Sequence, residues 1–166
     1  MIKDSGARRE FESGAVRDMA EGKGRCDLLP LDIVCDLFDF IGIEINIIRL
    51  LSQFQDTGSE KYLYEALNYF TANEYGSYGE MLLSVAKQYE EGAKKYNDNN
   101  WKNGIPTSVY LDSAIRHYLK FSAGFEDEPH DRAFCWNLFG CLWTIKHKPE
   151  LHNVGVEIDL DDSKLH

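Results

Sequence analysis

Apolar residues recur at intervals of three and four along most of the chain, which is the period of a helix with one buried face. The first such segment opens at Pro30, a residue type favoured in the first helical turn, and continues to Leu51, although Gly42 allows a break within it. Four more helices are predicted over residues 60–72, 80–96, 109–121 and 129–146. The pattern therefore predicts a mostly α protein, a helical bundle of about five helices.

The chain divides into three parts by composition. Residues 1–29 combine six Lys and Arg with four Gly, and predict an irregular basic N-terminal arm. Residues 30–147 are expected to form a single helical domain, and residues 148–166 predict a solvated acidic tail.

Composition and charge exclude several classes of protein. The chain has 166 residues, of which 43% are hydrophobic, enough for the core of one ordinary domain. Its formal net charge of −10 disfavours duplex nucleic acid as a partner, because such binding needs a cationic surface for the phosphates. Polar residues interrupt the longest apolar region, so we expect no membrane-spanning helix there. The first 12 residues lack the apolar stretch of an export signal. With no CxxC pair among its four cysteines, we expect a reduced, cytoplasmic protein without membrane contact.

Two neighbouring carboxylates lie on the predicted helix 80–96. Glu90 and Glu91 stand four positions before Lys94 and Lys95. Such pairs are typical of a solvated helix face, where each contributes about 0.3–0.5 kcal/mol. The alternative is a carboxylate pair that binds a hard divalent cation, with the lysines facing phosphate oxygens.

The predicted helix 109–121 is largely apolar but carries three polar side chains within two turns. Asp112 and Arg116 share one face, and His117 lies to one side of them. The pair is either a surface ion pair or, because the helix is largely buried, a pair that requires a partner or a ligand.

The predicted helix 129–146 places His130 and Asn137 two turns apart on one side. His130 either caps the helix and packs in the core, or faces a cavity together with Asn137. Asp127 and Glu128 precede this helix, where acidic residues favour a helix N-terminus. Alternatively, these two residues add carboxylates to a metal site.

Glycines and cations alternate in the N-terminal arm around Arg17, Lys23 and Arg25. Glycine allows backbone N–H groups to approach an anion, and the cations supply charge and forked donors. The sequence is not a Walker motif, because GxxxxGK[ST] is absent. A phosphate-binding loop and a flexible basic arm therefore both remain open.

Four blocks of sequence, within residues 13–30 and 85–143, occur in a distinctive order: SGAVRDMAEGKGRCDLLP, YEEGAKKYNDNNWKNGIP, YLDSAIRHY and HDRAFCWN. Together they resemble the dATP/dGTP diphosphohydrolase N-terminal domain family, which is frequent in phages and prophages. Relative to that pattern, residues 36–80 are similar to an enlarged helical insert. The resemblance implies a nucleotide ligand and, more distantly, the all-α MazG-like nucleotide pyrophosphohydrolases.

The MazG-like pattern EExxE, followed by ExxD on the next helix, is only partly present. Glu90 and Glu91 match the first two acids, whereas Lys94 occupies the place of the third. Asp112 is the only acid of the following helix, so ExxD is missing. These departures weaken the inference of a two-metal hydrolytic centre.

The leading hypothesis is a protein that binds purine nucleoside phosphates and hydrolyses a triphosphate to monophosphate and diphosphate with Mg²⁺ or Mn²⁺. The expected metal ligands are Glu90, Glu91 and Asp112, with Asp127 and Glu128 as helpers. His117 and His130 are expected to orient water or the leaving group. The residues expected at the phosphates or the nucleotide are Arg17, Lys23, Arg25, Lys94, Lys95, Arg116, Asn137 and, by stacking on the base, Trp101.

Two other hypotheses remain. The first is a non-catalytic protein that sequesters a nucleotide, such as a phage protein binding a host immune signalling nucleotide; it accounts for the missing acids. The second is a purely structural helical module. By resemblance to MazG-like bundles we also expect a homo-oligomer, for which the broad apolar helices 31–51 and 62–70 would suit an interface.

Overall fold

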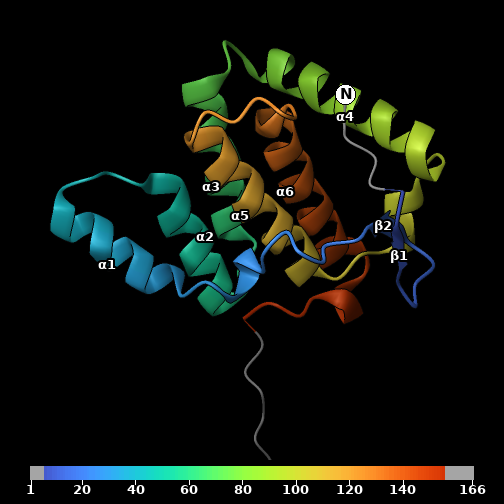
Figure 1. Cartoon of the computed structure of the whole chain (residues 1–166), viewed down its shortest axis with the longest axis horizontal. Coiled ribbons are helices and arrows are strands. Elements are labelled where there is room, and N and C mark those ends of the chain that lie inside the picture. The colour runs from blue at the N-terminus through green and yellow to red at the C-terminus, as the bar shows by residue number, and fades with distance from the viewer. Residues whose placement is uncertain (1–5, 156–166) are drawn as a thin grey trace, which may run out of the picture.

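The computed structural model describes residues 6–155 and is mostly α, as the hydrophobic pattern predicted. Its α-helices are α1 (Leu31–Ile41), α2 (Asn46–Thr57), α3 (Lys61–Glu74), α4 (Tyr78–Tyr96), α5 (Thr107–Ser122) and α6 (His130–His147) (Figure 1). Single 3₁₀ turns lie at η1 (Cys26–Leu28), η2 (Asn100–Asn103) and η3 (Pro149–Leu151). Among the described residues, no helix combines the length and apolar character that crossing a bilayer requires.

The first predicted helix is divided into two. Gly42 adopts a left-handed conformation with φ of 72°, and its N–H donates to the carbonyls of Phe38 and Asp39. This C-cap ends α1, because a left-handed residue cannot continue a right-handed helix. The chain then re-enters a helix at Asn46, so six helices replace the predicted five.

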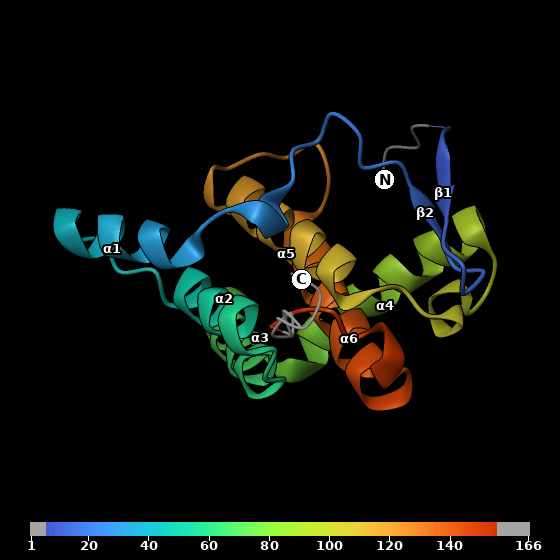
Figure 2. The same cartoon turned by 90° about the horizontal axis from the view of Figure 1, so that it is seen from below.

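The antiparallel pair α5 and α6 lies at the centre of the bundle. Helices α2 and α3 pack on one side of this pair and α4 packs against α6 on the other (Figures 1 and 2). Their apolar stripes meet in one core, whose largest fully buried side chains include Leu51, Phe54, Leu63, Phe70, Tyr110, Ile115, Phe134 and Leu138. The core thus fixes α5 and α6 as a rigid frame.

Helix α1 packs along α2 and extends to the edge of the molecule (Figure 2). Several of its apolar side chains remain exposed, including Ile33, Leu37 and Phe40, the last with 89% of its surface accessible. The prediction of an oligomer interface on this helix stays a prediction.

The N-terminal arm differs from its prediction in two respects. It contains a short antiparallel pair, β1 (Arg8–Glu10) and β2 (Val16–Asp18), with Arg9 opposite Arg17. Its six Lys and Arg are matched by six Asp and Glu, so the arm as a whole is not basic. After β2 the chain runs across the bundle to η1, which contacts α5 (Figure 1).

The first part of the predicted solvated tail packs on the bundle instead. His152 hydrogen-bonds the carbonyl of Gly58 at 2.9 Å and contacts the ring of Phe54. Asn153 accepts the N–H of Ser108 at 2.9 Å, and so caps the start of α5 from a distant position. The remainder of that tail, residues 156–166, lies outside the described residues.

Candidate functional site

A cavity of about 590 Å³ lies between the strand pair, α4, α5 and α6. Its walls come from residues 16–23 of the N-terminal segment, the second half of α4 with the following loop, and facing positions of α5 and α6. Of the residues that the sequence singled out, the cavity gathers Arg17, Lys23, Glu90, Trp101, Asp112, Arg116, His117, Glu128 and Asn137.

Arg17 connects the N-terminal segment to the two central helices. From β2 its Nη2 donates to Ser113 Oγ on α5 at 3.3 Å and to Asn137 Oδ1 on α6 at 3.1 Å. Its guanidinium carbon lies 5.4 Å from the ring centroids of both Tyr110 and Trp136. Both hydrogen-bond acceptors are neutral.

The second guanidinium nitrogen of Arg17, Nη1, is buried and has no hydrogen-bond partner among the described residues. Burial also lowers the pKa of this side chain. An arginine nevertheless stays protonated in proteins. A buried cation without a carboxylate is costly unless an anion pairs with it, and the planar fork of arginine matches phosphate oxygens.

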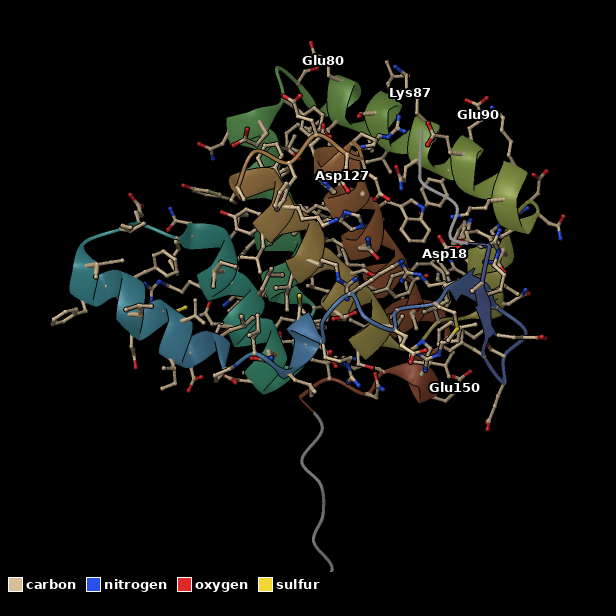
Figure 3. The ribbon with its side chains drawn as sticks, viewed as in Figure 1. Asp18, Glu80, Lys87, Glu90, Asp127 and Glu150 are labelled. Atoms are coloured by element: carbon tan, nitrogen blue, oxygen red, sulfur yellow. The ribbon has the colours of Figure 1, made fainter. Side chains whose placement is uncertain are left out.

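Asp18, the next residue of β2, anchors the strand pair to the end of α4 (Figure 3). Its carboxylate accepts hydrogen bonds from Lys95 Nζ, from Tyr96 Oη at 2.6 Å and from Arg8 Nη1 at 3.0 Å. Lys95, expected at the phosphates, is therefore engaged by Asp18 with only 8% of its side chain exposed. The ion pair holds Arg17 in place from the opposite side of the strand.

Replacing Asp18 by alanine is expected to release the strand pair from α4. Three donors lose a shared acceptor, so we expect a loss of about 2–3 kcal/mol in the free energy of unfolding. Urea denaturation would measure this loss, and amide exchange would show faster exchange at Arg17 than in α5. Glu12→Ala is a control on the same segment. Unchanged exchange in residues 8–18 would contradict the anchoring role.

Asp112 and Arg116 pair with each other on α5. Asp112 Oδ2 binds Arg116 Nη2, while Oδ1 accepts the N–H of Cys26 at 2.6 Å. Arg116 Nη2 also donates to the carbonyl of Gly24 at 2.9 Å. The pair thus ties the segment before η1 to α5 and lines the cavity without a free carboxylate oxygen. Asp112 and Arg116 therefore form a structural ion pair that also lines the cavity.

The other expected metal ligands on α4 do not converge on Asp112. Glu90 lies at the outer rim of the cavity, where its side chain is largely exposed and pairs with Lys94 at 2.8 Å (Figure 3). Glu91 instead binds Arg132 of α6 at 2.6 Å. Because each carboxylate is turned to a different cation, the structure does not gather them around one ion.

Arg25, expected at the phosphates, lies outside the cavity wall. Its exposed guanidinium pairs with Asp27 at 2.6 Å. Lys23 does line the cavity, from an exposed position.

Two histidines meet where α5 passes the start of α6. Nδ1 of His117 lies 2.9 Å from Nδ1 of His130, and Nε2 of His130 lies 2.8 Å from Asp127 Oδ1. Burial, together with the neighbouring His130, lowers the pKa of His117 to about 3, so its imidazole is neutral at pH 7. The bond to His130 lowers the pKa of Asp127 to about 2. His117 lines the cavity, whereas His130, which one alternative placed at a cavity together with Asn137, packs behind it.

Aromatic side chains form the apolar part of the cavity wall. Trp101 packs edge to face on Tyr89 at 5.4 Å between ring centroids, and Tyr89 packs on Trp136 at 5.8 Å. The indole N–H of Trp136 is buried without a hydrogen-bond partner in the described part of the chain. A planar base fits such a wall by stacking, with the indole N–H as a donor.

The cavity residues that sequence analysis did not select include Tyr89, Ser113 and Trp136. Each lies directly beside a residue that it did select, inside one of the four distinctive sequence blocks. A signal for these positions was therefore present in the blocks, although the helical period alone does not single them out.

Comparison with known families gives one match. Residues 52–154, more than half of the chain, match the family dATP/dGTP diphosphohydrolase, N-terminal. The chain belongs to this family. No curated protein and no solved structure matches it.

The match to the dATP/dGTP diphosphohydrolase N-terminal family includes only part of the cavity lining. It covers α3 to α6 and the second half of α2, and therefore three of the cavity walls. Arg17, Lys23 and the backbone that binds Asp112 precede the matched region. Within the segment 36–80, expected to be an insert, residues 52–80 fall inside the match.

Proposed function

We propose that the protein binds a purine nucleoside triphosphate in the cavity, with the phosphates at Arg17. The observation that carries this proposal is the buried guanidinium of Arg17, which has only neutral partners and an unpaired Nη1. A phosphate group would supply the missing anion through charge-assisted hydrogen bonds.

The remaining cavity wall supports the same ligand. Lys23, Arg116 and Lys120 bring further cations to the lining, and the aromatic cluster of Tyr89, Trp101 and Trp136 suits a base. The volume of about 590 Å³ is within the range of small-molecule sites, roughly 300–1,000 Å³. The preference for a purine follows from the name of the family.

The proposed reaction is hydrolysis at the α-phosphorus. A water oxygen forms a bond to the α-phosphorus, and the bond between the α-phosphorus and the oxygen shared with the β-phosphorus breaks. The products are a nucleoside monophosphate and diphosphate. His117 lines the cavity and is neutral, so it offers a lone pair that orients water. Membership of a diphosphohydrolase family supports turnover.

One observation favours the second candidate, a protein that retains its nucleotide unchanged. Glu90, Glu91 and Asp112 are each engaged by a cation, so the acidic residues expected for hydrolysis are committed to ion pairs. Binding through Arg17 does not require them. Retention and hydrolysis therefore differ in what happens after binding.

Chromatography of bound and released nucleotides separates the two candidates. The full chain is incubated with a panel of deoxynucleoside and nucleoside triphosphates and cyclic signalling nucleotides, with Mg²⁺ or Mn²⁺, and is then denatured by heat. We expect conversion of dATP or dGTP to the monophosphate in amounts exceeding the protein. Recovery of intact nucleotide at one equivalent per site would favour sequestration, and no bound nucleotide at all would contradict the proposal.

A further inference from the structure

We propose that His117, Glu128 and His130 form a binding site for one divalent transition-metal ion at the edge of the cavity. Binding of the ion does not depend on the proposed function. A role of the ion in hydrolysis does rest on that function. Among residues 6–155 this is the one group of three such side chains whose ligand atoms all lie within 4.8 Å of one another. Of the metal ligands expected from the sequence, the site includes Glu128 but not Glu90, Glu91 or Asp112.

The two imidazoles already have the geometry of a chelating pair. Their Nδ1 atoms lie 2.9 Å apart, which is close to the separation of neighbouring ligand atoms around an ion bound at about 2.0–2.1 Å. Without an ion, one proton must occupy the space between the two lone pairs. An ion that replaces this proton satisfies both nitrogens at once.

The orientation of His130 agrees with a ligand role. Its side chain is buried, with 1% exposed, and Nε2 is held by Asp127 Oδ1 at 2.8 Å. Metal-binding histidines typically donate their other N–H to a carboxylate, which fixes the ring and makes it a better donor. Lys120 in turn holds Asp127 at 3.2 Å, so the supporting carboxylate is itself fixed.

The position of the site connects it to the cavity. His117 and Glu128 line the cavity, whereas His130 lies behind them at the start of α6. Glu128 belongs to the loop between α5 and α6, so the loop completes a set that the two helices begin. Three protein ligands leave at least one position for water or a phosphate oxygen.

The donor set determines which ion is expected. Mg²⁺ prefers oxygen ligands and octahedral geometry, whereas imidazole suits the borderline ions of the first transition series. Two nitrogens and one carboxylate therefore favour Mn²⁺, Co²⁺ or Zn²⁺ over Mg²⁺. Of the two ions expected from the sequence, the site selects Mn²⁺.

Titration of the nucleotide-free full chain with Mn²⁺, Co²⁺, Zn²⁺ and Mg²⁺ separately tests the site. Calorimetry is expected to show one Co²⁺ or Zn²⁺ per chain and at least about tenfold weaker Mg²⁺ binding. The visible absorption of Co²⁺ reports whether imidazole nitrogens coordinate the ion.

Variants then assign the ligands. Glu128→Gln is expected to weaken Co²⁺ binding at least about tenfold, and Asp127→Asn about 10- to 100-fold through the orientation of His130. Glu126→Gln, in the same exposed loop but outside the cluster, is the matched control and should bind as the unmodified chain does. These changes are near the surface, so folding is retained and can be verified by circular dichroism.

Equal Co²⁺ affinity in Glu128→Gln, Asp127→Asn and the control would overturn the site, as would a Co²⁺ spectrum of the hydrated ion at saturating protein. Nucleotide binding measured in a chelator tests the proposed function separately. A chain that binds Co²⁺ but no nucleotide keeps the metal site and removes the proposed function. A chain that binds nucleotide but no Co²⁺ keeps the proposed function and removes only the metal site.

Discussion

Glutamine in place of Arg17 is expected to weaken dATP or dGTP binding by roughly a hundredfold. The change removes the charge-assisted hydrogen bonds of one guanidinium, worth about 3 kcal/mol, which is a factor of about 100 in Kd. Stability should be unchanged or should rise, because a buried cation without a carboxylate partner is removed. Calorimetric titration at fixed ionic strength, with a thermal melt of each protein, measures both quantities.

Arg25→Gln provides the matched control for this experiment. Arg25 lies eight positions further along the same segment, but it is exposed and pairs with Asp27 outside the cavity. We expect its Kd to stay within about twofold of the unmodified chain, as for a surface ion pair. If Arg17→Gln lowers the melting temperature while the Kd is unchanged, Arg17 is a structural residue and the binding proposal fails.

The second large effect is expected from Gly140→Ala in α6. Alanine normally stabilises a helix interior relative to glycine by about 0.5–1 kcal/mol. Here the added Cβ would lie 2.3 Å from Cε1 of Tyr110, whose ring is fully buried in the core. Because the ring cannot move freely, we expect a net loss of about 1–3 kcal/mol in the free energy of unfolding, measured in urea.

The displaced ring also affects the ligand. Arg17 packs over Tyr110, so a shift of this ring should weaken nucleotide binding in Gly140→Ala as well. Gly92→Ala is the control, since Gly92 lies within α4 and an added Cβ meets nothing within 4 Å. That variant should be stabilised by about 0.5–1 kcal/mol. An equal stabilisation of both variants would show that α5 and α6 do not pack as described around Tyr110.

Local signals in the sequence were sufficient for the helices. Apolar periodicity placed α3 to α6 within two residues of their observed bounds, and the suspected break at Gly42 occurs where left-handed glycine ends α1. The end of α2 was missed by six residues, because the predicted helix stopped at Leu51. The pair Glu90–Lys94 was also visible, because four positions bring two side chains together on any helix. These features depend only on neighbours in sequence.

The site depends on contacts between distant positions, and here the sequence was not sufficient. Glu91 pairs with Arg132, 41 positions away, and Lys95 pairs with Asp18, 77 positions away. The sequence left two interpretations of Glu91 and Lys95 open, a pair four positions apart or contacts with a metal and a phosphate. Tertiary packing instead decides which charges neutralise one another, and it leaves Arg17 without a carboxylate.

The position of Arg17 before the matched region affects how fragments of proteins in this family should be chosen. A fragment cut to residues 52–154 keeps α3 to α6 but loses α1 and half of α2, and it omits Arg17 and the backbone N–H that holds Asp112. Such a fragment would test the stability of the frame and would say nothing about ligand choice. Grafting the first 30 residues of one family member onto the helices of another is therefore the direct way to ask whether ligand preference can be exchanged as a separate part.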